Sequence, residues 1–434
     1  MGVGRWRLEG RGVPLSLSLI SIIGMAKLLF PCLFLLAQGK LVATLVESEQ
    51  TIAAQFCFPT VLGTQGKGTI TIEAISTEAN HRIAVFPMLS SAEIHALLSD
   101  SSDPCETTHT QATFTFPMAK PNALYFQLFK VKAKPEQCFS VVAMRCAQPG
   151  KVNAGIYLDF VNNRETGYWD TAFSLEEIGL LRLFLGALVM SAGMAWWYVR
   201  NTGEMELQGV HPQLLILSRM TYISLAGAMA CWVSYYVLYS VTGMPSVLFK
   251  SMAIYSQWVF ELSTLALLSL NATGYFLRDQ PVLLEVQIVL VLNAVVSLYL
   301  NMRKALEPEN EVQFHWYWDT AWYAYSRLGT SIVLGLWSRN GYNQLGEGLR
   351  DRGVYWRMLV AGVLWMAVQP IGILAVKGSL ERFRWKFYQA GVTVLTDQCL
   401  CAWLLTVLNP ATSPLLFSKE TAIQSLKSSH RSLV

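Results

Sequence analysis

The stretch from Gln313 to Trp337 reads QFHWYWDTAWYAYSRLGTSIVLGLW, and the organisation of the chain follows from it. It is apolar enough to cross a bilayer, yet Arg327 lies near its middle. A charged side chain at the bilayer centre costs about 2.5 to 3.5 kcal/mol on insertion scales, so it should face the protein interior and find a carboxylate there. The stretch therefore predicts a membrane helix that packs against helices with acidic residues.

The composition of the whole chain agrees with a membrane protein. Of the 434 residues, 53% are hydrophobic and only 14% are charged, which is far more apolar than a soluble protein of this size. We interpret the chain as a polytopic membrane protein in contact with membrane lipid. The net charge of +4 is dispersed, without a long Lys/Arg block, so we expect no nucleic-acid binding.

The first 39 residues resemble a targeting segment. Lys27 provides a positive charge, Leu28 to Leu36 form an apolar run, and Ala37-Gln38-Gly39 fits a cleavage site. We expect a signal peptide over residues 1–39, removed after Gly39. An uncleaved signal anchor, which would add an eighth span, is the alternative.

Residues 40–171 change to short alternating runs bounded by Pro, Gly, Asn or Asp. Seven of these runs read as strands in roughly 130 residues, which suggests an antiparallel β-sandwich in the lumen or outside the cell. The predicted strands are Thr51–Phe58, Gly68–Ile75, Arg82–Met88, Ala112–Phe116, Ala123–Val131, Cys138–Arg145 and Gly155–Val161.

This region contains four cysteines, an even number in a segment that a signal peptide would deliver to an oxidising compartment: Cys57, Cys105, Cys138 and Cys146. If Cys138 to Cys146 is one strand, its ends lie about 26 Å apart at roughly 3.3 Å per residue, too far for a disulfide. We favour Cys57 with Cys146 and Cys105 with Cys138. The crossed pairing and four free thiols remain open.

The junction between the sandwich and the membrane contains a helix-start signal. Ser174 is followed three residues later by Glu177, just before an apolar run, which is the pattern of a capping box. The spacing predicts that the first membrane helix begins here.

Seven apolar segments of about 20 residues follow, which together predict an all-α seven-transmembrane bundle over residues 172–410. Seven spans after a cleaved signal place the N-terminal domain outside and the tail, residues 411–434, in the cytosol. The segments are Ile178–Tyr198, Gln213–Tyr239, Val247–Leu270, Val282–Leu300, Gln313–Trp337, Arg357–Val376 and Tyr388–Leu408.

Three ionisable residues lie near the centres of the third, fifth and seventh spans: Glu261, Arg327 and Asp397. Because intramembrane charges are rare and need partners, we expect these residues to form one cluster at the midplane. The cluster is either an ion pair that locks the helices together or a two-state element that holds a cavity or senses a proton.

Other membrane chemistries find no support in the sequence. The seventh span has no lysine for a retinal Schiff base, the six histidines are scattered, and no H-E-x-x-H or G-x-S-x-G motif occurs. We expect no enzyme activity, no cofactor and no metal site.

The junction carries a family resemblance. Phe160-Val161-Asn162-Asn163, followed by Phe173-Ser174-Leu175-Glu176-Glu177-Ile178-Gly179-Leu180, resembles the strand end and F-S-x-D/E-E-x-G-L helix entry of the intimal thickness-related receptor family. That family comprises rhodopsin-like seven-transmembrane proteins related to the Golgi-dynamics-domain superfamily. The resemblance implies a GPCR-like receptor of the secretory pathway or cell surface, and at family level a response to pheromone.

The chain departs from the rhodopsin pattern where G proteins couple. The third span ends in Phe276-Leu277-Arg278-Asp279 instead of D-R-Y, and Asn409-Pro410 ends the seventh span without the following Tyr. Three hypotheses remain. The first is a receptor whose sandwich binds an unknown extracellular ligand and whose bundle addresses a cytosolic signalling partner. The second is a Golgi or endosomal trafficking scaffold that binds protein cargo, and the third is a carrier of lipid or another small molecule that uses a cavity between helices.

Overall fold

The computed structural model describes much of the sandwich and of the helical region. The predicted signal peptide, Cys105, Ser174 and the predicted cytoplasmic tail lie outside the described residues. Those residues are 40–46, 50–58, 66–77, 80–87, 93–94, 96, 112–133, 137–146, 154–162, 173, 177–202, 212–273, 275–278, 284–306, 317–344, 352–379 and 385–408.

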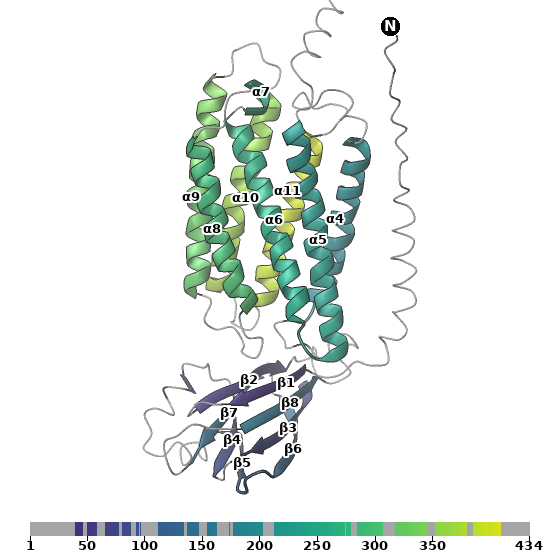
Figure 1. Ribbon diagram of the computed structural model, residues 1–434, viewed down its shortest axis with the longest axis vertical. Helices are drawn as coiled ribbons and strands as arrows, with labels where there is room; N and C mark the ends of the chain where they lie inside the picture. The colour runs from purple at the N-terminus through teal and green to yellow at the C-terminus, as the bar shows by residue number, and fades with distance from the viewer. Residues whose placement is uncertain are drawn as a thin grey trace, which may run out of the picture.

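The N-terminal part forms two antiparallel four-stranded sheets, as predicted (Figure 1). One sheet, here called sheet A, has the order β1-β8-β3-β6, and the other, sheet B, has the order β2-β7-β4-β5. The strands are β1 (Lys40–Val46), β2 (Gln50–Phe58), β3 (Gly66–Ser76), β4 (His81–Pro87), β5 (Phe114–Met118), β6 (Leu124–Ala133), β7 (Gln137–Arg145) and β8 (Ala154–Asn162).

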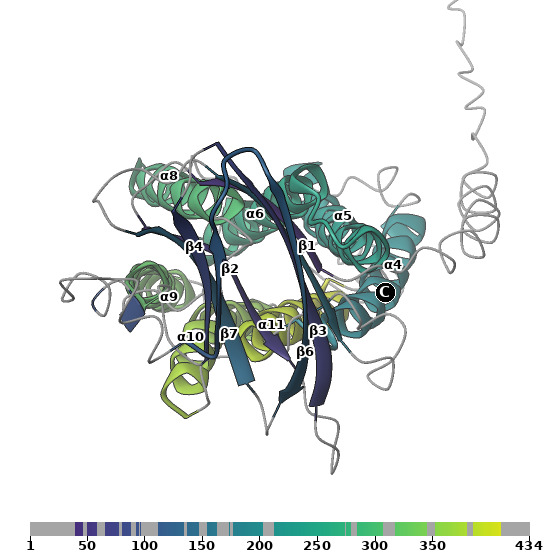
Figure 2. The same cartoon turned by 90° about the horizontal axis from the view of Figure 1, so that it is seen from below.

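The two sheets pack face to face around an apolar core. Along β8 the side chains alternate strictly between buried and half-buried, because successive residues of a strand point to opposite faces. Ile156, Leu158 and Phe160 thus face sheet B, where the Phe160 ring stacks on Phe56 with 4.9 Å between ring centres. Figure 2 shows the two sheets edge-on beneath the helices.

The first strand, β1, is absent from the sequence-based prediction. It pairs antiparallel with β8, from Lys40 opposite Phe160 to Val46 opposite Ala154. Its partner is more than 100 residues away in the chain, so the local pattern contains no sign of the pairing. The other seven strands overlap the predicted ones.

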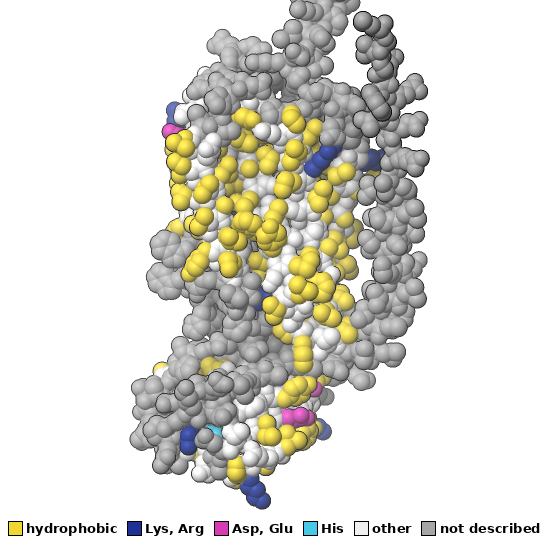
Figure 3. Space-filling view, in the orientation of Figure 1, with side chains coloured by type: hydrophobic (Ala, Val, Ile, Leu, Met, Phe, Trp, Pro, Cys, Tyr) yellow, Lys and Arg dark blue, Asp and Glu magenta, His cyan; other side chains and the backbone are white. Residues whose placement is uncertain are grey.

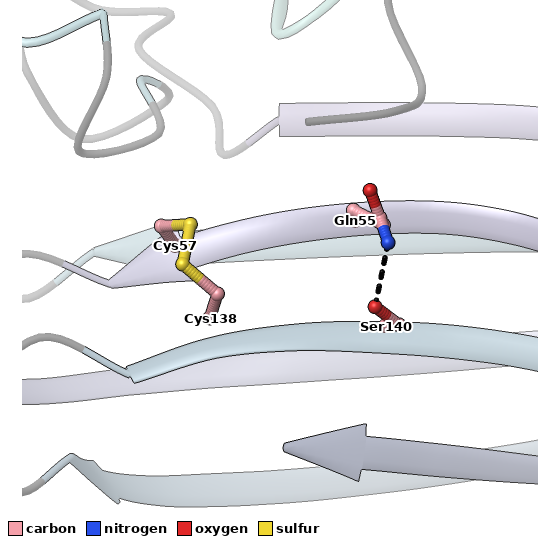
Figure 4. The surroundings of a disulfide bond; sticks show 4 residues. All are labelled: Gln55, Cys57, Cys138 and Ser140. Atoms are coloured by element: carbon pink, nitrogen blue, oxygen red, sulfur yellow. Dashed lines mark hydrogen bonds between the residues drawn. A yellow bond between two sulfur atoms is a disulfide. The ribbon is translucent and has the colours of Figure 1, made fainter. Parts of the chain in front are cut away.

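The structure overturns the favoured disulfide pairing. Cys57 bonds to Cys138, because the register of β2 and β7 places the two residues directly opposite each other (Figure 4). The pairing of Cys57 with Cys146 is therefore wrong, and the observed bond belongs to the crossed alternative. Cys146 is disulfide-bonded as well.

The rest of the described chain is helical. Among the described residues, six helices are long and apolar enough to cross a membrane, so the chain is a multi-pass membrane protein, and the prediction of seven such segments exceeds this number by one. The exception is α9, whose many Tyr and Trp residues and polar C-terminal turn lower its hydropathy. The helices are α4 (Leu180–Thr202), α5 (Pro212–Thr242), α6 (Val247–Ala272), α7 (Tyr275–Arg278), α8 (Leu284–Leu306), α9 (Tyr317–Gln344), α10 (Arg352–Ser379) and α11 (Trp385–Val407).

The long helices run side by side, and the sandwich lies against one end of them (Figure 1). The strand order of each sheet runs away from the bundle: β1 and β2 are nearest the helices, and β5 and β6 are farthest from them. α9 packs on α10 among the spans and extends beyond its predicted end to Gln344. Hydrophobic side chains are spread over the face of the bundle seen in Figure 3, as a lipid-facing surface requires.

Candidate functional site

Two of the three predicted midplane charges form an ion pair. An Arg327 terminal nitrogen on α9 lies 3.4 Å from a carboxylate oxygen of Glu261 on α6, and both side chains are largely buried. Another guanidinium nitrogen of Arg327 lies 3.5 Å from the Met366 sulfur on α10. The arginine therefore has its expected carboxylate inside the helical bundle.

The third predicted charge, Asp397 on α11, is connected to the pair through a tryptophan. The Trp365 indole N–H donates to a carboxylate oxygen of Asp397 over 2.8 Å. The Arg327 guanidinium carbon lies 4.3 Å from the centre of the same ring, within the range of a cation–π contact. The order of contact is thus Glu261, Arg327, Trp365, Asp397. We call these four residues the midplane cluster.

Asp397 is 1% exposed, and its second carboxylate oxygen has no hydrogen-bond partner among the described residues. The next residue, Gln398, donates its side-chain amide to the Ala187 carbonyl of α4 over 3.1 Å. The region around Asp397 therefore contacts both α10 and α4.

The space beside the cluster is small. A cavity of about 30 Å³ lies between α6, α8, α9 and α10, lined in part by Glu261, Asn293, Ser297 and Arg327. A cavity needs roughly 10 to 15 Å³ to hold one water molecule, so this one has room for water. The lock and the two-state element therefore both remain hypotheses for the cluster.

A larger groove lies between two of these helices, α6 and α8. It has a volume of about 280 Å³ and is lined by Ser251, Ile254, Tyr255, Trp258, Leu298, Asn301 and Met302. The Trp258 indole N–H donates to the Ser297 hydroxyl over 3.0 Å, and Ser297 also lines the small cavity. The interface between α6 and α8 thus has an apolar part at the groove and a polar part near Glu261 and Arg327.

The junction residues lie elsewhere than the capping box predicts. α4 begins at Leu180, so Glu177 precedes the helix and cannot be its third residue. Its buried carboxylate instead lies 2.6 Å from the Lys386 ammonium at the start of α11. Gly179 makes the turn between Glu177 and the start of α4. Its φ of +88° is a conformation that L side chains disfavour. Glu177 therefore lies outside the helix that it was predicted to begin, and it connects the start of α4 to α11, whereas Ser174 lies outside the described residues.

A second contact at the junction ties the sandwich to the helices. The side-chain amide of Asn162, at the end of β8, donates to the Phe173 carbonyl over 2.5 Å. The buried Phe173 ring packs edge-on against Tyr236 and Tyr239 of α5, with ring centres 5.8 and 5.3 Å away. The last strand of the sandwich is thereby connected to the aromatic end of α5.

Sequence reasoning missed Trp365, Lys386 and Asn162 as partners of the predicted residues. Trp365 lies on another helix than its partners, and Lys386 is 209 residues from Glu177, so neither contact is visible in one sequence. A depth comparison such as the one that selected Asp397 could have selected Trp365, since both lie near the middle of their helices.

No family model matches this chain, and no curated protein matches it. The fold and the contacts define a multi-pass membrane protein with an N-terminal β-sandwich and a buried charge cluster.

Proposed function

We propose that this protein is a receptor-like seven-transmembrane protein in which the sandwich binds a partner outside the cytosol and the helical bundle responds. In this proposal α9 also crosses the membrane, which brings the number of spans from six to seven. Its buried Arg327, paired with Glu261 of the apolar helix α6, supports that placement.

The observation that carries the proposal is the junction. Asn162 and Phe173 connect β8 to α5, and Glu177 connects the start of α4 to Lys386 on α11. A partner that displaces β8 would therefore act on α5 through buried contacts, and on the start of α4 through the chain that leads from Phe173 to Glu177. A sandwich that only held cargo beside a membrane anchor would not require such contacts.

The test measures whether a change in the sandwich reaches the helices. In the full-length protein in nanodiscs, Asn162→Ala should speed hydrogen exchange in the last turns of α5 and the first turn of α4. The matched control is Gln55→Ala, which also removes a buried amide, here the 2.8 Å bond to Ser140 inside sheet B (Figure 4). The control should speed exchange in β2 and β7 alone.

If Asn162→Ala also leaves the helices unchanged, the sandwich is mechanically independent and the receptor proposal fails in favour of the trafficking scaffold. Steady-state localisation of the tagged full-length chain separates the two further. A receptor should be found at the plasma membrane, whereas a cargo scaffold should be found in the Golgi or endosomes.

A further inference from the structure

The groove between α6 and α8 lies on the lipid-facing surface of the bundle. α8 is the least buried of the six apolar helices, with only 6% of its apolar segment buried. Of the lining residues, Tyr255 of α6 and Met302 of α8 are 60% and 55% exposed. Both helices lie on the face of the bundle that Figure 3 shows, among hydrophobic side chains. The groove is therefore open to molecules that diffuse within the bilayer.

The lining of this α6–α8 groove changes from polar to apolar with depth. α5 ends where Tyr239 packs on Phe173 beside the sandwich, so α6 begins and the antiparallel α8 ends on that side (Figure 1). Ser251 and Asn301 thus lie nearer the sandwich than Trp258 and Leu298, which lie deeper in the hydrocarbon. The groove therefore has the polarity of one leaflet of the membrane.

The two polar side chains nearer the sandwich have no hydrogen-bond partner among the described residues. Neither the Ser251 hydroxyl nor the Asn301 amide bonds to another described side chain or carbonyl. At the deeper end, by contrast, the Trp258 indole N–H donates to Ser297. A side-chain amide in contact with hydrocarbon is costly unless it is hydrogen-bonded. Asn301 would therefore gain from a ligand that places a hydroxyl group at its level.

The lining also restricts the rest of that ligand. Among the described residues that line the groove none is charged, whereas phosphate head groups are recognised by Arg and Lys. The rings of Tyr255 and Trp258, with centres 5.5 Å apart, offer broad and rigid apolar faces. The volume of about 280 Å³ is close to the lower end of small-molecule sites, about 300 Å³. These features fit an uncharged amphiphile with a small polar head and a rigid apolar body.

We propose that the α6–α8 groove binds a sterol from the leaflet on the sandwich side. The sterol hydroxyl bonds to Asn301 and Ser251, and the fused rings lie against Tyr255, Trp258 and Leu298. The inference does not depend on the proposed receptor function, since it requires only that α6 and α8 cross the membrane.

A sequence pattern on α8 coincides with the groove. Val296, Tyr299 and Arg303 fit a short motif proposed for sterol contact, in which an aliphatic residue, a tyrosine and a basic residue follow one another. The motif is too common in membrane helices to carry the inference by itself. Here it falls on the helix that provides Leu298 and Asn301 to the groove.

The test uses the full-length protein in phosphatidylcholine nanodiscs that contain a cholesterol probe with a photoactivatable diazirine on its rings. After illumination, peptide mass spectrometry should find the label on the groove residues of α6 and α8, and excess cholesterol should suppress it. Leu298→Trp fills the groove and should reduce this labelling by about tenfold or more. Leu292→Trp, the same change at an exposed position of α8 outside the groove, is the matched control and should leave it unchanged.

A second variant tests the polar contact. Asn301→Leu removes the amide and should weaken the competition by cholesterol by about fivefold, which corresponds to one hydrogen bond. Against the wild-type protein, cholestene, which lacks the hydroxyl, should compete as poorly as cholesterol does against the variant. Formation of the Cys57–Cys138 bond and an unchanged unfolding temperature verify that each variant is folded.

A parallel sample distinguishes the other occupants of the groove. It replaces the sterol probe by a phosphatidylcholine with the diazirine on an acyl chain. Labelling of the groove by this probe as strongly as by the sterol would mean that bulk lipid fills it, and no labelling by either would mean that a second copy or another protein covers it. Either result, full labelling of Leu298→Trp, or cholestene competing as well as cholesterol would overturn the proposal.

Discussion

At the scale of single residues, the midplane cluster joins four helices through one series of contacts. Arg327 meets a carboxylate on α6, an aromatic face on α10 and, through that ring, a carboxylate on α11. Burying these charges is costly, and the cost is offset only while each of them keeps its partners. The cluster therefore makes the relative positions of α6, α9, α10 and α11 interdependent.

Replacing Arg327 should expose that dependence. Arg327→Met leaves the Glu261 carboxylate buried beside an apolar side chain, and breaking a buried pair in this way costs about 3 to 5 kcal/mol. We expect a sharp loss of folded yield on size exclusion and a lower unfolding temperature. Adding Glu261→Gln should recover part of both, because it removes the stranded charge.

The control for this prediction is Arg339→Met, which changes an exposed arginine on the same helix. It should leave yield and unfolding temperature unchanged. An Arg327→Met protein with normal yield and stability would show that the ion pair contributes nothing to folding.

Asp159 provides a prediction about pH. Because burial and Glu73 raise its pKa, the folded sandwich binds this proton more tightly than the unfolded chain does. The free energy of unfolding should then fall as the pH rises from the ordinary carboxyl pKa through the raised one. Asp159→Asn should stabilise the sandwich at neutral pH and remove this part of the pH dependence.

Hydrogen exchange of the β8 amides in the full-length protein, followed from acidic to neutral pH, measures this opening free energy. Wild type and Asp159→Asn should agree at the acidic end and diverge as the pH rises. Divergence at the acidic end instead would mean that the free energy of unfolding depends on pH in the opposite direction. That result would refute a raised pKa for Asp159.

At the scale of elements, the turn before α4 positions the first helix. Its sequence resembles a capping box, but the chain uses Glu177 for an ion pair with Lys386 and turns at Gly179. A capping box depends on local spacing alone, whereas the observed arrangement needs α11, more than 200 residues later. The strand patterns, by contrast, were predictable because they are local: burial on one face imposes alternation within each strand.

Gly179→Ala tests this turn. An L residue at φ +88° costs roughly 1 to 2 kcal/mol, and the new methyl group would lie 3.0 Å from the Phe387 ring. We expect a lower unfolding temperature of the purified protein. Gly186→Ala, within α4 and with nothing near its added methyl group, should be neutral or slightly stabilising. Equal effects of the two changes would mean that the turn carries no strain.

At the scale of the whole molecule, the number of crossings decides which side each end occupies. The long helices alternate in direction, and the sandwich and the end of α11 lie at opposite ends of the bundle (Figure 1). If α9 crosses the membrane together with the six apolar helices, the sandwich and the C-terminus lie on opposite sides.

A tag after Val434 tests that crossing. In intact cells an antibody to the sandwich should bind the surface pool of the protein, whereas the tag should become accessible only after permeabilisation. Accessibility of both without permeabilisation would mean that one helix, with α9 the first candidate, does not cross.

The sequence by itself determined the class of the protein, because composition and hydrophobic period are local properties that burial in lipid or in a sheet imposes on every segment. It also selected Glu261, Arg327 and Asp397, since a charge within an apolar run stands out without any partner. Only the tertiary structure decided the partners: Trp365 between Arg327 and Asp397, Cys138 for Cys57, Lys386 for Glu177 and β1 beside β8. These contacts depend on strand register and on the rotation of each helix about its axis, which are set by the packing of distant segments against one another.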